Sequence, residues 1–225
     1  PYVGAAKCID VMETGEMLTI PLLDIPVFGG TIKEMSKNCY AAYQLLPTSK
    51  YYNITGTYPL SVNGTNYSTV MTQLQNTAWG KKSDGTVKPM FSTATTFHSS
   101  LINSSTHIIN HSDVTTYTIA ATGEDTISKV SMDSNYEITA LTYSNAGDET
   151  VLQKSAGYGV PDYTFSGTTH TDMVSDSGVI SKIKSIITSE TGVSAASVSN
   201  GTISSNDEAV IYTSASVEID PNKIT

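Results

Sequence analysis

The chain has 225 residues, enough for one large domain or two small ones, and its 39% hydrophobic content can supply a buried core. Its formal net charge is −9, and all 12 basic residues are lysines, because the sequence contains no arginine. This charge argues against binding to nucleic acid and against electrostatic docking on anionic membranes, since both need clustered positive charge. No apolar run is long enough for a transmembrane helix, so we expect no transmembrane segment.

Serine, threonine and asparagine are abundant, and only 15% of the residues are charged. Such a neutral, polar surface suits an extracellular or cell-surface setting, which we therefore expect. Six Asn-X-Ser/Thr sequons are a weak indication of glycosylation, because a chain this rich in Ser and Thr makes several by chance. Cys8 and Cys39 could pair in a secreted protein, but two free, partly buried thiols are the interpretation we favour.

Residues 1–47 alternate turns with apolar runs. Residues 3–12 predict a short helix that Gly15 ends, and residues 32–46 predict a second helix that Pro47 ends. Between them, MLTIPLLDIPVFGG at 17–30 contains two prolines that forbid a long helix, so we expect an apolar loop that is either buried or a mobile flap.

The middle of the chain, residues 48–113, is rich in Tyr, Thr, Asn and Gly and has no strong periodicity. Its composition is typical of an inserted cap rather than of a sheet core. Within it, residues 69–77 and 91–103 are predicted to be helical.

Residues 114–190 carry strand patterns followed by a helix. TTYTIAATG predicts a strand, KVSMDSNYEITALTY predicts two strands around a turn at 133–135, and PDYTFSG predicts another. Residues 177–188 place five apolar side chains on one helical face, with Asp176 as N-cap. Residues 191–225 read as a linker or the start of a further β-domain, with a strand pattern at 210–225.

Two short stretches after the predicted strands carry candidate chemistry. GDETV at 147–151 puts Asp148 in a turn led by a glycine, and GTTHTD at 167–172 puts His170 in a turn. In a hydrolase triad, a carboxylate orients a histidine, and the histidine moves the proton of the nucleophile. The alternative for Asp148 is a turn-capping aspartate, and for His170 a surface histidine beside a helix.

The ordered set of motifs resembles lecithin:cholesterol acyltransferase-like proteins over roughly residues 1–190. PYVGAAKCIDVMETGEMLTIP and the later LLP at 45–47 resemble the segment after the nucleophile strand of that family. ATGEDTISKV is similar to its glycine-threonine-glycine strand end, GDETVLQKSA to its GDGTV-x-x-x-SA acid motif, and FSGTTHTDMVSD to its histidine turn. The resemblance implies an α/β fold, the C-terminal part of an α/β-hydrolase with an inserted cap and lid, with Asp148 as acid and His170 as base.

The sequence departs from the family pattern in two ways. Glu149 stands where the acid motif has its second glycine, which either strains the turn or only moves a surface side chain. The nucleophile elbow G-x-S-x-G is absent, and neither Ser155 nor Ser166 lies in a strand-to-helix elbow with flanking glycines. We therefore expect the serine upstream of Pro1, in the N-terminal half of the same enzyme, on the same or a separate chain.

The resemblance implies a serine lipase, phospholipase or acyltransferase that acts on lipid or acyl-ester substrates without a cofactor. The segment 17–30 matches the position of the family lid, and its expected acyl-binding residues are Leu18, Ile20, Leu22, Leu23, Val27 and Phe28. The alternative is a catalytically inactive extracellular binding or surface module on a hydrolase-like scaffold.

The remaining histidines suggest no metal site. His107 and His111 lie four residues apart, but HIINH lacks the glutamate of a metalloprotease helix and is β-branched at its centre. His98 is expected at a half-buried position of the cap.

Overall fold

The computed structural model describes residues 2–16, 18–20, 25–27, 29–101 and 115–191, with backbone alone at 18–20, 25–27 and 190–191. The chain divides into two units, residues 1–173 and 174–225. The sequence instead grouped residues 114–190, so the helix predicted at 177–188 belongs with the C-terminal unit and not with the strands before it.

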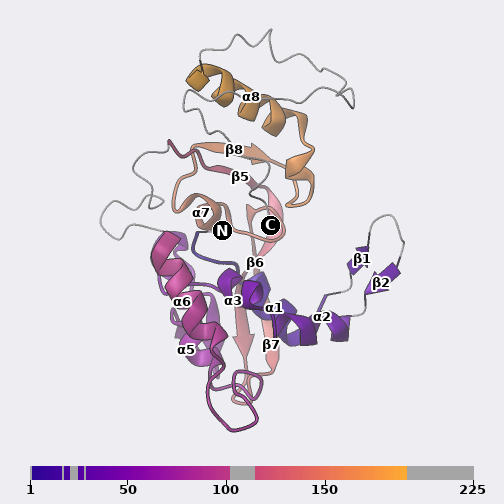
Figure 1. Cartoon of the computed structure of the whole chain (residues 1–225), viewed down its shortest axis with the longest axis vertical. Helices are drawn as coiled ribbons and strands as arrows, with labels where there is room; N and C mark the ends of the chain where they lie inside the picture. Colours follow the sequence, from indigo (N-terminus) through magenta and orange to yellow (C-terminus); the bar gives the residue numbers. More distant parts are fainter. Residues whose placement is uncertain (1, 17, 21–24, 28, 102–114, 192–225) are drawn as a thin grey trace, which may run out of the picture. The chain divides into compact units, whose positions relative to one another are not determined.

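The first unit has mixed α/β architecture, built on a four-stranded mixed sheet (Figure 1). Its strand order is β4-β3-β6-β7, with β3 at Leu60–Val62, β4 at Thr65–Tyr67, β6 at Glu124–Met132 and β7 at Ile138–Gly147. Strand β3 runs parallel to β6, and the other neighbours are antiparallel. A separate parallel pair joins β5 at Ile119–Thr122 to β8 at Tyr163–Ser166.

Short helices surround the sheet. They are α1 at Lys7–Thr14, α2 at Gly29–Ser36, α3 at Tyr40–Leu45, α4 at Tyr51–Thr55, α5 at Val70–Leu74, α6 at Met90–Leu101 and α7 at Gln153–Gly157. Helix α1 packs on β6, and α3 packs on α6. The core between them is formed by side chains that include Ile9, Met12, Tyr43, Leu60, Phe91 and Val130, all at most 1% exposed.

The strands after residue 114 confirm the sequence patterns. The turn between β6 and β7 is held by Asp133, whose Oδ1 accepts hydrogen bonds from the amides of Asn135 and Glu137 at 2.8 and 2.9 Å. Helix α8 spans Ser177–Thr191 in the second unit, and Asp176 caps it by accepting from the Val179 amide at 2.8 Å. The strand predicted at 210–225 lies outside the described residues.

The predicted helix at 32–46 is wrong, because two helices, α2 and α3, replace it. The Lys37 carbonyl accepts hydrogen bonds from Tyr43 Oη at 2.8 Å and Lys88 Nζ at 2.9 Å, and is therefore not the acceptor of a continuing helix. Cys39 then adopts an extended conformation ahead of α3. The first helix also begins later than predicted, at Lys7, although Gly15 ends it as expected, with its N–H on the Val11 carbonyl.

Two expectations of irregular structure are also wrong. The segment 48–113 contributes β3 and β4 to the sheet, with Leu60 of β3 buried in the core, so it is not wholly an insertion outside the sheet. The apolar segment 17–30 contains a short antiparallel hairpin, β1 at Leu18–Ile20 and β2 at Ile25–Val27, and its two glycines begin α2.

The two ends of the β1–β2 segment meet at Gly15 and Gly29. Gly15 has φ +80°, and a Cβ at this position would lie 1.9 Å from the Gly29 carbonyl oxygen. Only glycine permits both the conformation and this close approach of two backbone segments. In Figure 1 the hairpin projects from the region of α1 and α2.

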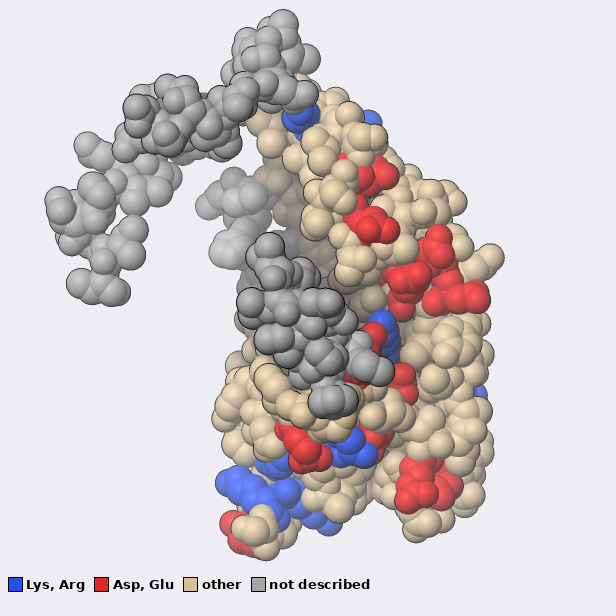
Figure 2. Space-filling view, turned by 90° about the vertical axis from the view of Figure 1, so that its right-hand side faces the viewer, with Lys and Arg blue, Asp and Glu red and all other residues tan. Residues whose placement is uncertain are grey.

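The surface shown in Figure 2 is mostly uncharged, as the composition predicts, and acidic side chains are spread over it. Among the described helices, none combines the length and the apolar character that a membrane-spanning helix needs.

Candidate active site

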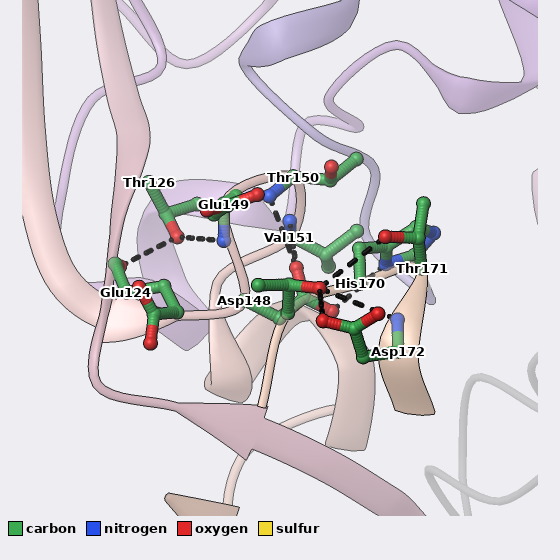
Figure 3. Close-up of polar contacts among 10 residues, drawn as sticks. Glu124, Thr126, Asp148, Glu149, Thr150, Val151, His170, Thr171 and Asp172 are labelled. Atoms are coloured by element: carbon green, nitrogen blue, oxygen red, sulfur yellow. Dashed lines mark hydrogen bonds and ion pairs between the residues drawn. The ribbon is translucent and has the colours of Figure 1, made fainter. Parts of the chain in front are cut away.

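Asp148 and His170, which lie 22 residues apart in the sequence, meet in the first unit. His170 Nδ1 lies 2.8 Å from Asp148 Oδ2, and the His170 backbone N–H donates to the Asp148 carbonyl at 2.8 Å (Figure 3). Asp148 follows β7, and His170 follows β8. The two residues that the motif order predicted as acid and base are therefore in direct contact.

The carboxylate of Asp148 is buried, with its side chain 5% exposed, and each oxygen has a partner. Oδ1 accepts hydrogen bonds from the amides of Val151 at 2.7 Å and Thr150 at 3.0 Å, and Oδ2 faces His170. Burial, the largest influence, raises the pKa of Asp148, but the hydrogen bonds from His170 and the two amides together outweigh it and lower the pKa below its usual value. Asp148 is therefore ionised at neutral pH.

The imidazole of His170 is half exposed, at 50% of its side chain. The hydrogen bond with Asp148 raises the pKa of His170, and partial burial opposes this effect. Because an ionised carboxylate can only accept, the neutral imidazole carries its proton on Nδ1 and leaves the lone pair on Nε2. No residue of the described ranges forms a hydrogen bond with Nε2. This ring is oriented as a general base is in a hydrolase triad.

A small turn holds His170 in place. Thr169 Oγ1 donates to Asp172 Oδ2 at 2.7 Å and accepts from the Asp172 amide at 3.3 Å. The Met173 amide then donates to the Thr169 carbonyl at 3.1 Å. These bonds tie the 3-10 turn Asp172–Val174 to Thr169, the residue directly before His170.

Gly147 is required at the start of the acid turn. A Cβ at this position would lie 2.5 Å from Thr126 Oγ1 and 2.6 Å from the Val151 carbonyl oxygen, closer than real contacts allow. The Asp148 amide donates to that same Val151 carbonyl at 3.3 Å, so the clash would fall on the turn that positions the acid.

We therefore expect Gly147→Ala to destabilise the protein by about 1–3 kcal/mol through overpacking, a fall in Tm of roughly 2–10 °C for a chain of this size. Thermal unfolding followed by circular dichroism measures the change. Gly30→Ala is the matched control, because nothing lies within 4 Å of a Cβ at Gly30 and its φ is not positive. If Gly147→Ala lowers Tm no more than Gly30→Ala does, the clash at Gly147 adds nothing to the cost of the substitution, and the expectation is contradicted.

The candidate serines do not complete the pair. Ser155, in α7, is fully buried and its Oγ donates to the Gly4 carbonyl, which links α7 to the N-terminal segment. Ser166 ends β8. Within the ranges that the structure describes, no hydroxyl or thiol forms a hydrogen bond with His170.

The lid prediction lies largely outside the described residues. Leu22, Leu23 and Phe28 fall outside them, and Leu18, Ile20 and Val27 are described by their backbone alone, in β1 and β2. Their assignment to acyl binding therefore stays a prediction.

The other residues singled out in the sequence lie away from this pair. Cys8 and Cys39 are free thiols, and Cys8 Sγ donates to the Ala42 carbonyl at 3.1 Å, while burial raises the pKa of the Cys8 thiol to about 12. His98 is half-buried as expected, and its Nε2 lies 2.6 Å from the Gln44 carbonyl oxygen. His107 and His111 lie outside the described residues. In the described part of the chain, no three His, Cys, Asp or Glu side chains gather as a metal site.

The sequence did not indicate Thr126, whose hydroxyl contacts the acid turn. No motif marks it, because a threonine in a strand pattern is ordinary and its contact depends on how β6 and β7 pair.

No family model and no curated protein matches this chain.

Proposed function

We propose that this chain supplies the acid and base of a Ser-Asp-His triad in a lipase, phospholipase or acyltransferase of the lecithin:cholesterol acyltransferase-like type. Asp148 is the orienting acid and His170 is the general base and acid. The serine lies N-terminal to Pro1, on the same or a separate chain, and the fold is the C-terminal part of an α/β-hydrolase. The observation that carries the proposal is the 2.8 Å contact between a buried carboxylate and a half-exposed histidine.

The chemistry follows from the orientation of His170. Nε2 takes the proton of the serine hydroxyl as its oxygen attacks the carbonyl carbon of an acyl ester. The imidazolium returns this proton to the departing alkoxide, which leaves an acyl-serine. Nε2 then takes a proton from water or from an acceptor alcohol, which attacks the acyl-serine and releases the acid or a new ester. Asp148 stabilises the imidazolium at each stage.

The location and the substrate class of the proposed enzyme are inferred from its composition. The uncharged surface favours an extracellular or cell-surface protein, and the apolar residues of the 17–30 segment favour substrates with acyl chains. The proposal needs no cofactor, because serine, histidine and aspartate carry the whole cycle.

A fluorophosphonate probe, which forms an adduct only with an activated serine, tests the proposal. We expect one adduct per molecule in the full-length protein, on a serine before Pro1, and no adduct on a protein limited to residues 1–225. Intact mass and peptide mapping read the result. An adduct within residues 1–225 would refute the proposed place of the serine. No adduct in either protein, nor on a second chain that co-purifies with it, would favour a non-catalytic binding module.

Activity and stability are expected to respond to pH in opposite directions. Because the base must be neutral and the pKa of His170 is raised by Asp148, kcat/KM falls as the pH drops through a value above about 6.5. A group with a raised folded-state pKa stabilises the protein fully below its unfolded pKa and loses that contribution as the pH rises through the folded pKa. The His170 contribution to stability is therefore lost over the pH range in which activity appears. A pH–rate profile beside denaturation curves at pH 5.5 to 8.5 measures both, and an acid limb below about 6 would contradict the expectation.

A further inference from the structure

The acid turn contains a residue in an unfavourable backbone conformation. Glu149, directly after Asp148, has φ +76°, in the left-handed region. Residues with a side chain rarely adopt it, because Cβ crowds the carbonyl oxygen, and glycine is the usual choice. The departure seen in the sequence, glutamate for glycine, therefore puts strain into the turn, and neighbouring contacts must hold that conformation.

One such contact comes from Thr126 in β6. Its Oγ1 accepts a hydrogen bond from the Glu149 backbone N–H at 2.9 Å and donates one to the Glu124 carbonyl at 3.0 Å (Figure 3). Thr126 is 0% exposed, so water cannot replace either bond. The hydroxyl thus uses its donor and an acceptor to tie the strained residue to β6.

The strand pairing explains why Thr126 reaches the turn. Glu124 pairs with Gly147, but Thr126 pairs with Ser144, so the register of β6 and β7 shifts between these two positions. Such an irregularity bends the strand and redirects side chains, and it is common beside active sites. Since Gly147 has no side chain, Thr126 can lie against its backbone, immediately before Asp148.

The turn conformation determines what the carboxylate of Asp148 contacts. With Glu149 in its left-handed conformation, the next two amides, of Thr150 and Val151, point to Asp148 Oδ1. Oδ2 is then left to His170. If Glu149 relaxed to a right-handed conformation, these two amides would turn away, and the carboxylate would lose the contacts that fix its orientation.

We infer that Thr126 is a positioning residue for the Asp148–His170 pair, acting through the backbone of Glu149. Thr126 touches neither the imidazole nor a reacting atom. Its importance for catalysis rests on the proposed function, but its effect on His170 does not.

Proton NMR of His170 in the purified protein tests this inference without any need for activity. A hydrogen bond between Nδ1–H and a buried carboxylate gives a far-downfield proton signal, and titration gives the pKa of His170. We expect Thr126→Val, which keeps the shape but removes the hydroxyl, to weaken or abolish the downfield signal and to lower the His170 pKa toward about 6.5. Thr126→Ser, which keeps the hydroxyl, should match the wild type in both measurements.

A second pair of variants tests the route through Glu149. Glycine accepts φ +76° without strain, so Glu149→Gly should keep the signal, and Thr126→Val/Glu149→Gly should recover most of what Thr126→Val loses. The pair also carries the test if Thr126→Val alone does not fold. A folded Thr126→Val protein with unchanged signal and pKa would overturn the inference. An equal fall in the His170 pKa in both comparisons, from the wild type to Thr126→Val and from Glu149→Gly to the double variant, would also overturn it.

The two proposals can fail separately. If no serine takes up a fluorophosphonate but His170 responds to Thr126→Val, the triad is refuted and the positioning role stands. If the triad is active and His170 does not respond, Thr126 serves only the packing of β6. In an active enzyme, a positioning role predicts a lower kcat with little change in KM, because Thr126 makes no substrate contact.

Discussion

Replacement of His170 by alanine is expected to abolish fluorophosphonate labelling and to lower kcat/KM for acyl esters by on the order of 10⁴-fold or more in the full-length protein. The reason is that the serine hydroxyl then has no base, while the rest of the site is left intact. Removal of the imidazole also leaves Oδ2 of the buried Asp148 carboxylate without its partner, so we expect a loss of stability of about 1–3 kcal/mol beside the loss of activity. Label uptake, ester hydrolysis and thermal unfolding are measured on the same preparation.

His98→Ala is the matched control for this variant. His98 is also a partly buried histidine with one contact to a carbonyl oxygen, and it is no part of the proposed triad. It should label normally wherever it folds. Normal labelling of His170→Ala would remove His170 from the catalytic machinery.

The second large effect is expected for Asp148→Asn. The amide oxygen of asparagine can still accept from Thr150 and Val151, so the turn should survive. Its NH₂ group would then face His170 Nδ1 and favour the tautomer with the proton on Nε2, which cannot act as a base. We expect a loss of about 10³–10⁴-fold in kcat, with Tm close to wild type, and an acid limb moved toward lower pH because the carboxylate no longer raises the His170 pKa.

Asp148→Ala separates orientation from folding. This variant leaves the amides of Thr150 and Val151 without an acceptor beside a buried position. Each unsatisfied group costs about 1–3 kcal/mol, so we expect roughly 2–6 kcal/mol of lost stability in addition to the lost activity. Chemical denaturation of the two variants measures the difference. Equal stabilities would mean that the amides find water or other partners.

The parts of the fold that the sequence predicted are those determined locally. The turn at 133–135 depends on one aspartate that binds nearby amides, and α8 begins where Asp176 caps it. These two features need no knowledge of distant contacts.

The pair Asp148–His170 was predicted differently, from the resemblance of its two turns to a family's acid and histidine motifs. Asp148 directly follows β7, and His170 lies in the turn after β8.

Two of the parts that the sequence missed depend on distant partners. The helix at 32–46 is broken where the Lys37 carbonyl accepts hydrogen bonds from Tyr43, later in the same segment, and from Lys88, far along the chain. Thr126 was missed for the same reason, since its contact with Glu149 requires the register shift between β6 and β7.

Residues 60–62 are a different case, because a local signal was overlooked. Besides pairing with β6, they form a hairpin with β4 over Asn63-Gly64, whose positive φ values of 47° and 79° are typical of a type I′ turn.

The contact between Gly15 and Gly29 makes the residues between them an excursion that leaves and re-enters the protein at one point. Because its two ends are already joined in space, its length and composition can change with little effect on α1 and α2, as at other tolerated sites of insertion. This segment is therefore a replaceable module: a short glycine linker could substitute for residues 16–28, and segments from other proteins could be grafted there.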